Sequence, residues 1–371
     1  MRLVLLTDIC RPKQWKTIST KNLKTEGYPV YGANGVIGYF NEYTHEDPTI
    51  LITCRGATCG TINVCVPRSY VNGNAMALDN LSPKSDLNYL SYYLSHRGLN
   101  DVISGSAQPQ ITRQNLKKVK VPLPPLEEQK KIAAILDAAD EYRQKTKALI
   151  DKYDQLTQSL FLDMFGDPLT NSKGWEVVRF EDVILDMQNG IGKNKSFYGR
   201  GTKVANIGDL YPSYSFKPLK YSLLEVNENE IHKYRLKYGD LLFVRSSLKK
   251  EGVAFCSFYD SNEICLFSSF MIKASPDLTI LNPFFLSIQM RTESYRKYLI
   301  NAANTATITN ISQPNLKSLN LTLPPLELQN QFAERVAQIE KQKQQAETSL
   351  VKAEGLFNSL LQKAFKGELT N

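Results

Sequence analysis

Residues that could carry catalytic chemistry are few and scattered in this sequence. The three histidines, His45, His96 and His232, lie far apart, and no two cysteines have the Cys-x-x-Cys spacing of a zinc or redox site. Gly190-Ile-Gly-Lys193 lacks the first glycine of a phosphate-binding loop, and Asn194 follows where that loop needs Ser or Thr. We interpret this segment as a turn. The pattern predicts neither a metal site nor histidine-based catalysis.

One further string invites a catalytic interpretation. Asn282-Pro-Phe-Phe285 is the nearest match to the Asn/Asp-Pro-Pro-aromatic loop of enzymes that methylate an extruded adenine, but its second proline is missing. No Gly-rich nucleotide loop precedes it, and no Asp with a Glu-x-Lys pair indicates a nuclease. Asn282 as a helix N-cap, with Pro283 at the first helical position, explains the string better. We therefore expect a chain without catalytic residues.

Side chains suited to recognising nucleic acid are better represented. Arg can donate two hydrogen bonds to guanine, and Asn or Gln can bond adenine in the same bidentate way. Contacts to phosphate, which Lys can also make, position a protein without specifying sequence. Candidates of these types occupy loop-like segments of two separate regions. In the first region they are Asn34, Arg55, Asn72, Asn74, Gln108, Gln110 and Arg113, and in the second Lys193, Lys195, Arg245, Lys249, Lys250, Asn304 and Asn310.

The charge distribution agrees with two separate regions. The formal net charge of the 371 residues is +8. Lys and Arg outnumber Asp and Glu by 14 to 8 in residues 1–120 and by 19 to 14 in residues 168–320. Residues 121–167 are acidic, with 6 basic against 9 acidic side chains, and residues 321–371 are balanced at 6 each. Two basic blocks fit two footprints on a polyanion.

An internal repeat with an offset of 200 residues organises the whole chain. Pro122-Leu-Pro-Pro-Leu-Glu-Glu-Gln129 recurs as Thr322-Leu-Pro-Pro-Leu-Glu-Leu-Gln329, and matches at the same offset continue on both sides. Ile111 and Phe165, for example, correspond to Ile311 and Phe365. A register kept over more than fifty positions indicates duplication.

Each copy of the repeat opens a long helix. Pro124 and Pro125 end the preceding strand, and neither Pro nor Gly recurs before Gly166. Apolar positions then alternate by three and four residues, which is typical of a coiled-coil seam. We expect the two helices to pair antiparallel. The predicted seam is Ile132, Ile135, Ala139, Tyr142, Thr146, Leu149, Tyr153, Leu156 and Leu160, with Phe332, Val336, Ile339, Lys343, Ala346, Leu350, Ala353, Phe357 and Leu360 in the second copy.

The segments that precede the helices have the composition of mixed α+β domains. Both contain an apolar strand that ends in a basic loop, at Thr49–Gly56 and Asp240–Ser246, and both later contain an aromatic helix, near Tyr89–Leu94 and Phe284–Ile288. We therefore predict an α+β fold with two pseudo-repeated domains joined by two long helices in an antiparallel coiled coil. The predicted boundaries are 1–120 and 168–320 for the domains, and 121–167 and 321–371 for the helical regions.

Together these features resemble the specificity subunit of type I restriction–modification systems. Besides the repeated Pro-Leu-Pro-Pro-Leu-Glu-Glu-Gln, the resemblance rests on Ser159–Pro168 followed by Lys173-Gly-Trp175, on Tyr28–Tyr39 and on Gly105–Ile111. It covers essentially the whole chain. The sequence departs from the family at its start, because the tryptophan that often opens a recognition domain is present as Trp175 but absent before Leu3.

The resemblance implies that each domain recognises one half of a split double-stranded DNA target. It also implies that the paired helices hold the halves at a fixed separation and dock two modification subunits, mainly through residues 121–167 and 321–369. Off-seam residues such as Glu127, Gln129, Lys130, Glu327 and Gln329 would form that docking face. S-adenosylmethionine, ATP and Mg²⁺ are then expected on the modification and restriction subunits, with no cofactor on this chain.

Two alternatives remain open from the sequence: a stand-alone DNA-modifying enzyme, and a coiled-coil adaptor with no role on DNA. The apolar run Leu3–Leu6 is too short for a signal peptide, and no stretch of about 18 apolar residues indicates a membrane span. We therefore expect a cytoplasmic protein without a membrane partner, whose six cysteines are reduced thiols.

Overall fold

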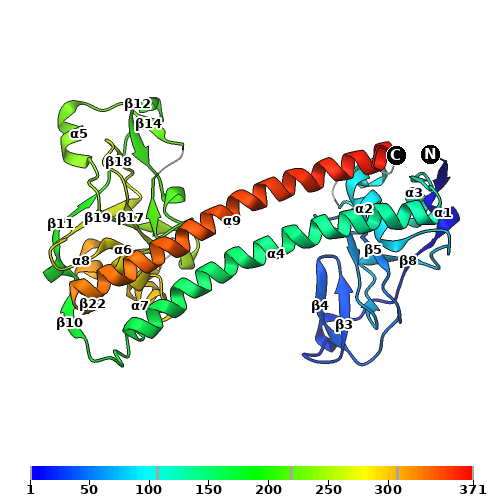
Figure 1. Cartoon of the computed structure of the whole chain (residues 1–371), viewed down its shortest axis with the longest axis horizontal. Helices are drawn as coiled ribbons and strands as arrows, with labels where there is room; N and C mark the ends of the chain where they lie inside the picture. Colours follow the sequence, from blue (N-terminus) through cyan, green and yellow to red (C-terminus); the bar gives the residue numbers. More distant parts are fainter. Residues whose placement is uncertain (1, 106–107, 218–219, 306–308, 370–371) are drawn as a thin grey trace. The chain divides into compact units, whose positions relative to one another are not determined.

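The computed structural model describes residues 2–105, 108–217, 220–305 and 309–369, except for the side chains of Asn304 and Thr305. Its contacts divide the chain into a first unit, Met1–Ala148 with Ala346–Asn371, and a second unit, Leu149–Gln345. The two long helices, α4 (Leu126–Phe165) and α9 (Leu326–Lys366), each contribute one half to each unit (Figure 1). Within the described residues, no helix is apolar over a length that could cross a membrane.

The first unit is built on a four-stranded antiparallel sheet with the order β2-β8-β5-β6. A smaller sheet, β4-β3-β7, contains the parallel pair β3–β7, and β1 pairs with β9. The strands are β1 (Leu3–Leu5), β2 (Arg11–Gln14), β3 (Tyr28–Gly32), β4 (Gly35–Phe40), β5 (Ile50–Thr53), β6 (Ile62–Val64), β7 (Tyr70–Val71), β8 (Ala75–Asp79) and β9 (Lys120–Pro122). Its short helices are α1 (Leu6–Ile9), η1 (Thr20–Asn22), α2 (Leu87–Arg97), η2 (Asn100–Val102) and α3 (Arg113–Leu116).

The central strand β5 is apolar at successive positions because it is covered on both faces. Successive strand side chains point to opposite faces of a sheet. Ile50 and Ile52 pack with Leu90 and Leu94 of α2 in the main core, whereas Leu51 lies in a second cluster that includes Tyr31 and Val71. Both faces of the strand are therefore buried.

The second unit repeats this architecture with additions. Its main sheet has the order β11-β19-β15-β17-β13, and a smaller sheet, β14-β12-β18, contains the parallel pair β12–β18. The strands are β10 (Glu176–Arg179), β11 (Ile184–Asn189), β12 (Tyr198–Ala205), β13 (Ser215–Phe216), β14 (Ser222–Leu224), β15 (Leu241–Val244), β16 (Ser246–Ser247), β17 (Cys256–Tyr259), β18 (Leu266–Phe267), β19 (Met271–Pro276), β20 (Asn304–Thr305), β21 (Thr309–Asn310) and β22 (Asn320–Leu323). The helices are η3 (Phe180–Val183), η4 (Lys195–Phe197), η5 (Ile207–Asp209), α5 (Glu228–Tyr234), η6 (Lys250–Gly252), α6 (Pro283–Gln289), α7 (Glu293–Ala302) and α8 (Gln313–Lys317).

Strand orders match between the two units. β11-β19-β15-β17 corresponds to β2-β8-β5-β6, β14-β12-β18 corresponds to β4-β3-β7, and the pair β10–β22 corresponds to β1–β9. β13 is an additional edge strand of the second unit. The predicted fold class, two pseudo-repeated α+β domains with two long helices, is confirmed.

The repeated Leu-Pro-Pro-Leu-Glu-x-Gln motif ends in a glutamine that is buried and hydrogen-bonded in the same way in both copies. Gln129 accepts a hydrogen bond from the Asp86 amide (2.9 Å) and donates to the carbonyls of Lys84 (2.9 Å) and Pro124 (2.8 Å). Gln329 repeats all three bonds with Asn282, Ile280 and Pro324 at 2.9, 3.1 and 2.8 Å. Both side chains are fully buried. Each glutamine fixes the N-terminus of α2 or α6 against the start of a long helix, so neither can belong to an exposed docking face as the sequence suggested.

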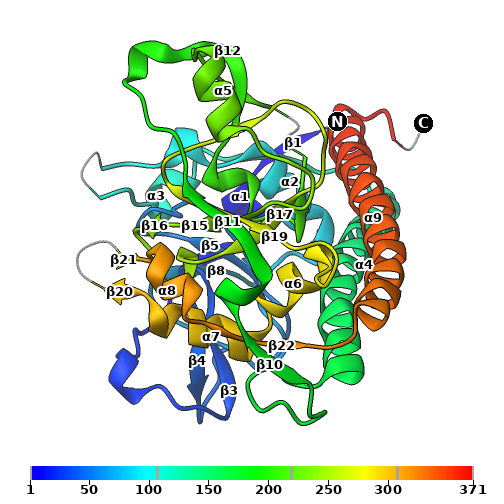
Figure 2. The ribbon, with the colours of Figure 1, turned by 90° about the vertical axis from the view of Figure 1, so that its left-hand side faces the viewer.

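Within each unit, the halves of α4 and α9 lie side by side and run antiparallel (Figures 1 and 2). In the first unit the Arg143 guanidinium lies 4.4 Å from the centre of the Phe357 ring, and Lys147 pairs with Glu354 at 3.6 Å. In the second unit Lys343 forms a 2.6 Å ion pair with Asp154. In each unit, residues nearer the C-terminus of α4 contact residues nearer the N-terminus of α9. This order of contacts confirms the predicted antiparallel pair.

The predicted seam residues differ in burial between the two helices, and on α4 alternate predicted positions are wrong by one residue. All nine predicted α9 residues are buried or partly buried. On α4, four predicted residues spaced by seven are exposed, whereas the residues that follow them pack inward. The exposed residues are Ile135 (38% exposed), Tyr142 (54%), Leu149 (42%) and Leu156 (49%), and those packed inward are Leu136, Arg143, Ile150 and Thr157.

The choice of apolar residues alone misplaced the α4 seam, because a charged residue, Arg143, occupies one of its positions. Its aliphatic stem can pack in the seam while the guanidinium stacks on Phe357 and pairs with Asp140. The repeat itself encodes the observed register, because adding 200 to Leu136 gives Val336, a seam residue of α9.

Candidate DNA interface

The loop after β5, residues 54–61, gathers most of the first-unit candidates. Arg55 forms an antiparallel bridge with Gln110. Thr58 of this loop donates a 2.6 Å hydrogen bond to the side chain of Asn34, and the Asn74 carbonyl accepts from Cys54. The candidates that lie on or next to the 54–61 loop are exposed, and they are Asn34, Arg55, Asn74, Gln108, Gln110 and Arg113.

Asn72 does not fit the proposed role of a base contact. It is only 4% exposed, and its amide oxygen accepts hydrogen bonds from the backbone of Ile18 (3.0 Å) and Gly73 (2.9 Å). Its amide nitrogen donates to the Ile18 carbonyl at 3.2 Å. The hydrogen-bonding capacity of Asn72 is used to hold two loops together, so we remove it from the candidate set.

The equivalent loop of the second unit, residues 245–255, gathers Arg245, Lys249, Lys250 and Asn310. Arg245 begins this loop, and β16 within it pairs with β21, which brings Ser246 opposite Asn310. Arg245, Lys249 and Lys250 are exposed, and among the described residues none of these three side chains has an ion-pair or hydrogen-bond partner. Unpaired cations at the end of a buried strand are suited to contact phosphates or guanine.

The remaining second-unit candidates lie elsewhere. The Lys193 ammonium donates to Glu230 (2.7 Å) and to the Glu225 carbonyl (3.1 Å), and its side chain is 18% exposed, so it stabilises the domain rather than facing a ligand. Lys195 is exposed but belongs to the segment before β12. Asn304 pairs through its backbone with Asn310, whereas its side chain lies outside the described part of the structure.

Arg55 and Arg245, which looked equivalent in the sequence, stand one position apart. The amide of Ile111 donates to Cys54 in the first unit, and the amide of Ile311 donates to Arg245 in the second. Arg245 therefore corresponds to Cys54, and Arg55 corresponds to Ser246. The two domains place their arginines at different points of the same loop, as expected if they contact different bases.

Two partly buried arginines that the sequence did not indicate hold the second-unit loops. Arg296 of α7 donates to the carbonyls of Glu251 (2.8 Å), Val253 (2.8 Å) and Ala254 (2.9 Å). Arg291 donates to Cys256 (2.7 Å) and Leu210 (2.6 Å). Burial lowers the pKa of both guanidinium groups, to about 10 for Arg291. No sequence signal marks these residues, because isolated arginines on a helix usually face solvent.

The strings tested for catalysis have structural roles. Asn282 caps α6 by accepting hydrogen bonds from the amides of Phe284 and Phe285, with Pro283 in the first turn, as predicted. Gly190 lies against the carbonyls of Phe267 and Ser268, where a Cβ atom would approach within 2.1 Å of oxygen. His45 is buried and bonded to Asp79. Over the described ranges, no three His, Cys, Asp or Glu side chains are grouped as metal ligands.

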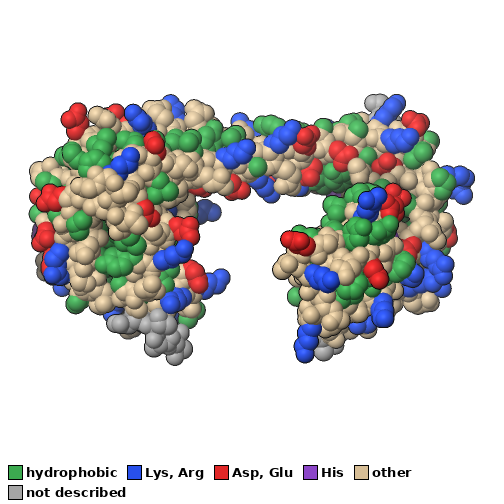
Figure 3. Space-filling view, turned by 90° about the horizontal axis from the view of Figure 1, so that it is seen from below, with side chains coloured by type: hydrophobic (Ala, Val, Ile, Leu, Met, Phe, Trp, Pro, Cys, Tyr) green, Lys and Arg blue, Asp and Glu red, His purple; other side chains and the backbone are tan. Residues whose placement is uncertain are grey.

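Surface charge is dispersed rather than concentrated. On the face shown in Figure 3, Lys and Arg side chains lie scattered over both units and alternate with acidic ones. Several surface cations are neutralised by ion pairs, such as Arg200 with Glu225 and Lys203 with Glu263. The exposed cations of the two loops, Arg55 in the first and Arg245, Lys249 and Lys250 in the second, have no side-chain partner among the described residues and are therefore more informative than the net charge.

Comparison with known proteins agrees with this geometry. The sequence profile of the type I restriction modification DNA specificity domain matches residues 2–152 and 172–352. The chain is 26% identical over 271 residues to the type I restriction enzyme EcoKI specificity subunit of Escherichia coli strain K12, which covers 68% of this chain and 58% of that subunit. It is 25% identical over 332 residues to the StySPI specificity subunit of Salmonella potsdam, with coverage of 85% and 69%. The chain thus spans less than two thirds of the first relative.

Solved structures show the same fold at low sequence identity. The S subunit of a type I restriction–modification system from M. genitalium superposes with a TM-score of 0.63 at 13% identity, covering 98% of this chain and 95% of that one. A chain from a structural study of type I R-M complex assembly gives a TM-score of 0.54 at 18% identity, with coverage of 99% and 98%. The match to the family profile extends over most of the sequence and confirms the predicted family: the chain belongs to the type I restriction–modification DNA specificity family.

Proposed function

We propose that this chain recognises a bipartite double-stranded DNA target, with each α+β domain specifying one half. The observation that carries the proposal is the pair of equivalent loops, 54–61 and 245–255, which follow corresponding buried strands. The first loop presents exposed Arg55 and the second presents Arg245, Lys249 and Lys250, all without a side-chain partner among the residues that the structure describes. Arginine and amide side chains in such loops can contact base edges, while the lysines contact phosphates. Two domains of the same topology with different loop residues suit two different half-sites.

The chain acts without catalysing a reaction, and it directs partner subunits to the target. In this proposal two modification subunits bind S-adenosylmethionine and methylate adenine, and restriction subunits supply ATP- and Mg²⁺-dependent translocation and cleavage. The chain itself binds no cofactor. Support comes from the family, whose curated relatives are named as specificity subunits of type I restriction enzymes. A DNA-directed role places the protein in the cytoplasm.

The exposed apolar positions of α4 provide a docking face for a modification subunit. In the first unit, Ile135 and Tyr142 stand seven residues apart on α4 and are left exposed. Exposed apolar side chains at this spacing match the face that a partner helix packs against. Tyr142→Glu should weaken complex formation at least tenfold in a pull-down with the modification subunit, whereas Gln144→Glu, an exposed control, should not.

The proposed function is tested by exchanging one domain. Residues 1–115 would be replaced by those of another family member, and methylated sites would be mapped by sequencing DNA from cells that make the chimera with its partners. We expect one half of the target to change and the other half to stay the same. A change in both halves would contradict the division of labour. If neither domain retards duplex DNA and no site is methylated, the chain is an adaptor without a DNA role.

A further inference from the structure

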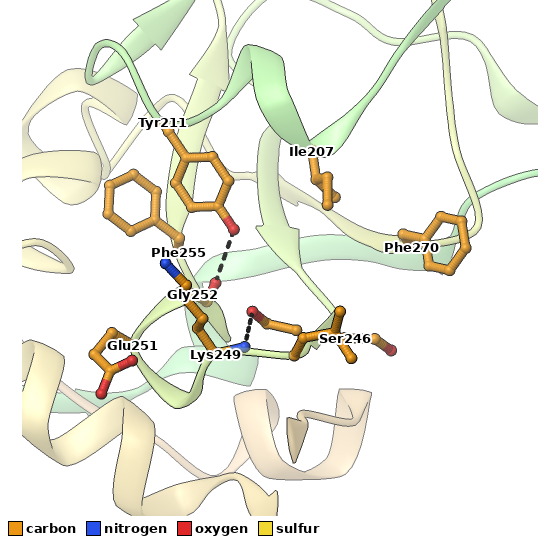
Figure 4. A pocket seen from close by; sticks show the side chains of 10 residues that line it. Ile207, Tyr211, Ser246, Lys249, Glu251, Gly252, Phe255 and Phe270 are labelled. Carbon is orange, nitrogen blue, oxygen red and sulfur yellow. Dashed lines mark hydrogen bonds between the residues drawn. The ribbon is translucent and has the colours of Figure 1, made fainter. Parts of the chain in front are cut away.

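The 245–255 loop borders an apolar cavity of about 640 Å³. Its main walls are Ile207, Tyr211, Leu248, Phe255 and Phe270. Figure 4 shows Tyr211 and Phe255 next to each other on one side and Phe270 on the other, with Ser246, Lys249 and Gly252 at the base. The cavity therefore lies among the residues that the sequence indicated for DNA contact.

Two side chains at this cavity expose apolar surface to water. Leu248 is 85% exposed and Phe270 is 58% exposed. Single exposed apolar side chains are common, but here two of them border one hollow on a loop that otherwise presents cations. The arrangement indicates a ligand that combines negative charge with a small apolar group.

The neighbouring charges favour a polyanion as the ligand. Lys249 and Glu251 line the cavity, Lys250 lies between them and Arg245 opens the same loop, so three cations stand against one carboxylate. Within the described residues no acidic side chain pairs with any of these three cations. Duplex DNA supplies the negative charge through its phosphates. Among the base edges in the major groove, the C5-methyl of thymine is the apolar group.

The cavity wall is held rigidly, as a site for shape recognition requires. The Arg291 guanidinium stacks 4.1 Å from the centre of the Phe255 ring, and the Tyr211 ring packs 4.9 Å from it. Arg296 fixes the carbonyls of residues 251, 253 and 254. A Cβ atom on Gly252 would lie 2.5 Å from the Ser247 hydroxyl and 3.0 Å from that of Tyr211, so a larger residue here would force the Ser247 side chain to move. A preformed wall lowers the entropy lost on binding.

We infer that the second domain recognises thymine in its half-site through apolar contact of the C5-methyl with Leu248 and Phe270. This inference rests on the proposed function and adds a base and a chemical group to it. The flanking lysines, Lys249 and Lys250, bind the adjacent phosphates, and Ser246 and Ser247 also line the cavity.

The test removes only the methyl group. Once the target is mapped, each thymine in the half-site assigned to the second domain is replaced by deoxyuridine, and affinity is measured with the full chain and its modification subunits. At one or more positions the affinity should fall about three- to tenfold, because a buried methyl contact is lost. In the Leu248→Ser chain the same replacement should have a smaller effect, because only the Phe270 contact remains. Leu185→Ser, which alters a leucine of the same domain that is 74% exposed, is the matched control and should keep the wild-type response.

The outcomes separate the inference from the function on which it rests. A specific target whose second half contains no thymine on either strand, or tolerates uracil at every position, overturns the methyl contact and leaves the proposed function intact. If Leu248→Ser weakens binding of the modification subunit instead of DNA, the cavity is a protein-docking site and the inference is wrong. Failure to bind any bipartite target overturns the proposed function, and the inference with it.

Discussion

The two recognition domains share a sheet topology but differ in chemistry at equivalent positions. Backbone hydrogen bonds from Cys54 to Asn74 and from Arg245 to Phe270 show that Asn74 and Phe270 are structural counterparts. In the same way, Thr61 corresponds to Phe255. The first domain is polar where the second has an aromatic wall. Duplication therefore preserved the frame, while the side chains at the strand ends diverged, as two different half-sites require.

Substitution of the buried glutamine should lower the free energy of unfolding by a similar amount in both domains, because its hydrogen bonds are the same in both. Gln129→Ala and Gln329→Ala each leave two carbonyls and one amide without their side-chain partner, so each should lower the free energy of unfolding by about 2–4 kcal/mol. Chemical denaturation checks the loss, and Gln331→Ala, an exposed position, is the control. A large loss in one domain and none in the other would show that the frames are not equivalent.

A substitution in the recognition loop of one domain should affect binding to only one half of the target. Arg55→Ala should weaken the free energy of specific binding by about 1–3 kcal/mol if its guanidinium bonds guanine. The loss of specificity should be confined to base pairs of the first half-site. Arg245→Ala should act only on the second half-site. Competition binding with duplexes that carry changes in one half measures both effects. An unchanged ratio of specific to nonspecific affinity would reduce either arginine to a phosphate contact.

Much of the frame could be predicted from the sequence because a repeated pattern encodes it. The offset of 200 residues, the long helices and the N-cap at Asn282 all follow from local rules. The α4 seam failed at Ile135 because an apolar side chain was preferred over the register that the repeat supplied. A direct transfer from α9 would have selected Leu136.

The interface was less predictable because its residues meet only in the folded chain. Asn72 has a side chain that could contact a base, yet its amide group is hydrogen-bonded to the backbone of Ile18 and Gly73. Conversely, Leu248 and Phe270 look like core residues in the sequence, and only the fold shows that they remain exposed. The type of a side chain indicates what it can bond, but burial decides whether that capacity is still available.

The smallest expected effect concerns one backbone position at which the frames differ. Gly60 and Ala254 both donate to the strand residue before their loops, Thr53 and Val244, and both have positive φ, +94° and +53°. A left-handed conformation costs an alanine roughly 1–2 kcal/mol, whereas a glycine loses more chain entropy on folding. Ala254 is fully buried in the core of the second unit, so removing its methyl group loses about 0.8 kcal/mol of burial and offsets the relieved strain. Ala254→Gly should therefore be close to neutral.

The reverse substitution provides the matched comparison. Gly60→Ala should destabilise by about 1 kcal/mol through backbone strain alone, because its added Cβ meets side chains of Ile103 and Leu99 no closer than 3.6 Å, an ordinary contact distance. Denaturation midpoints of the two variants measure both effects, and DNA affinity should stay unchanged. If Ala254→Gly proved clearly destabilising, the packing of the buried Ala254 methyl group would outweigh the backbone strain. The two loops would then differ in their packing as well as in their surface chemistry.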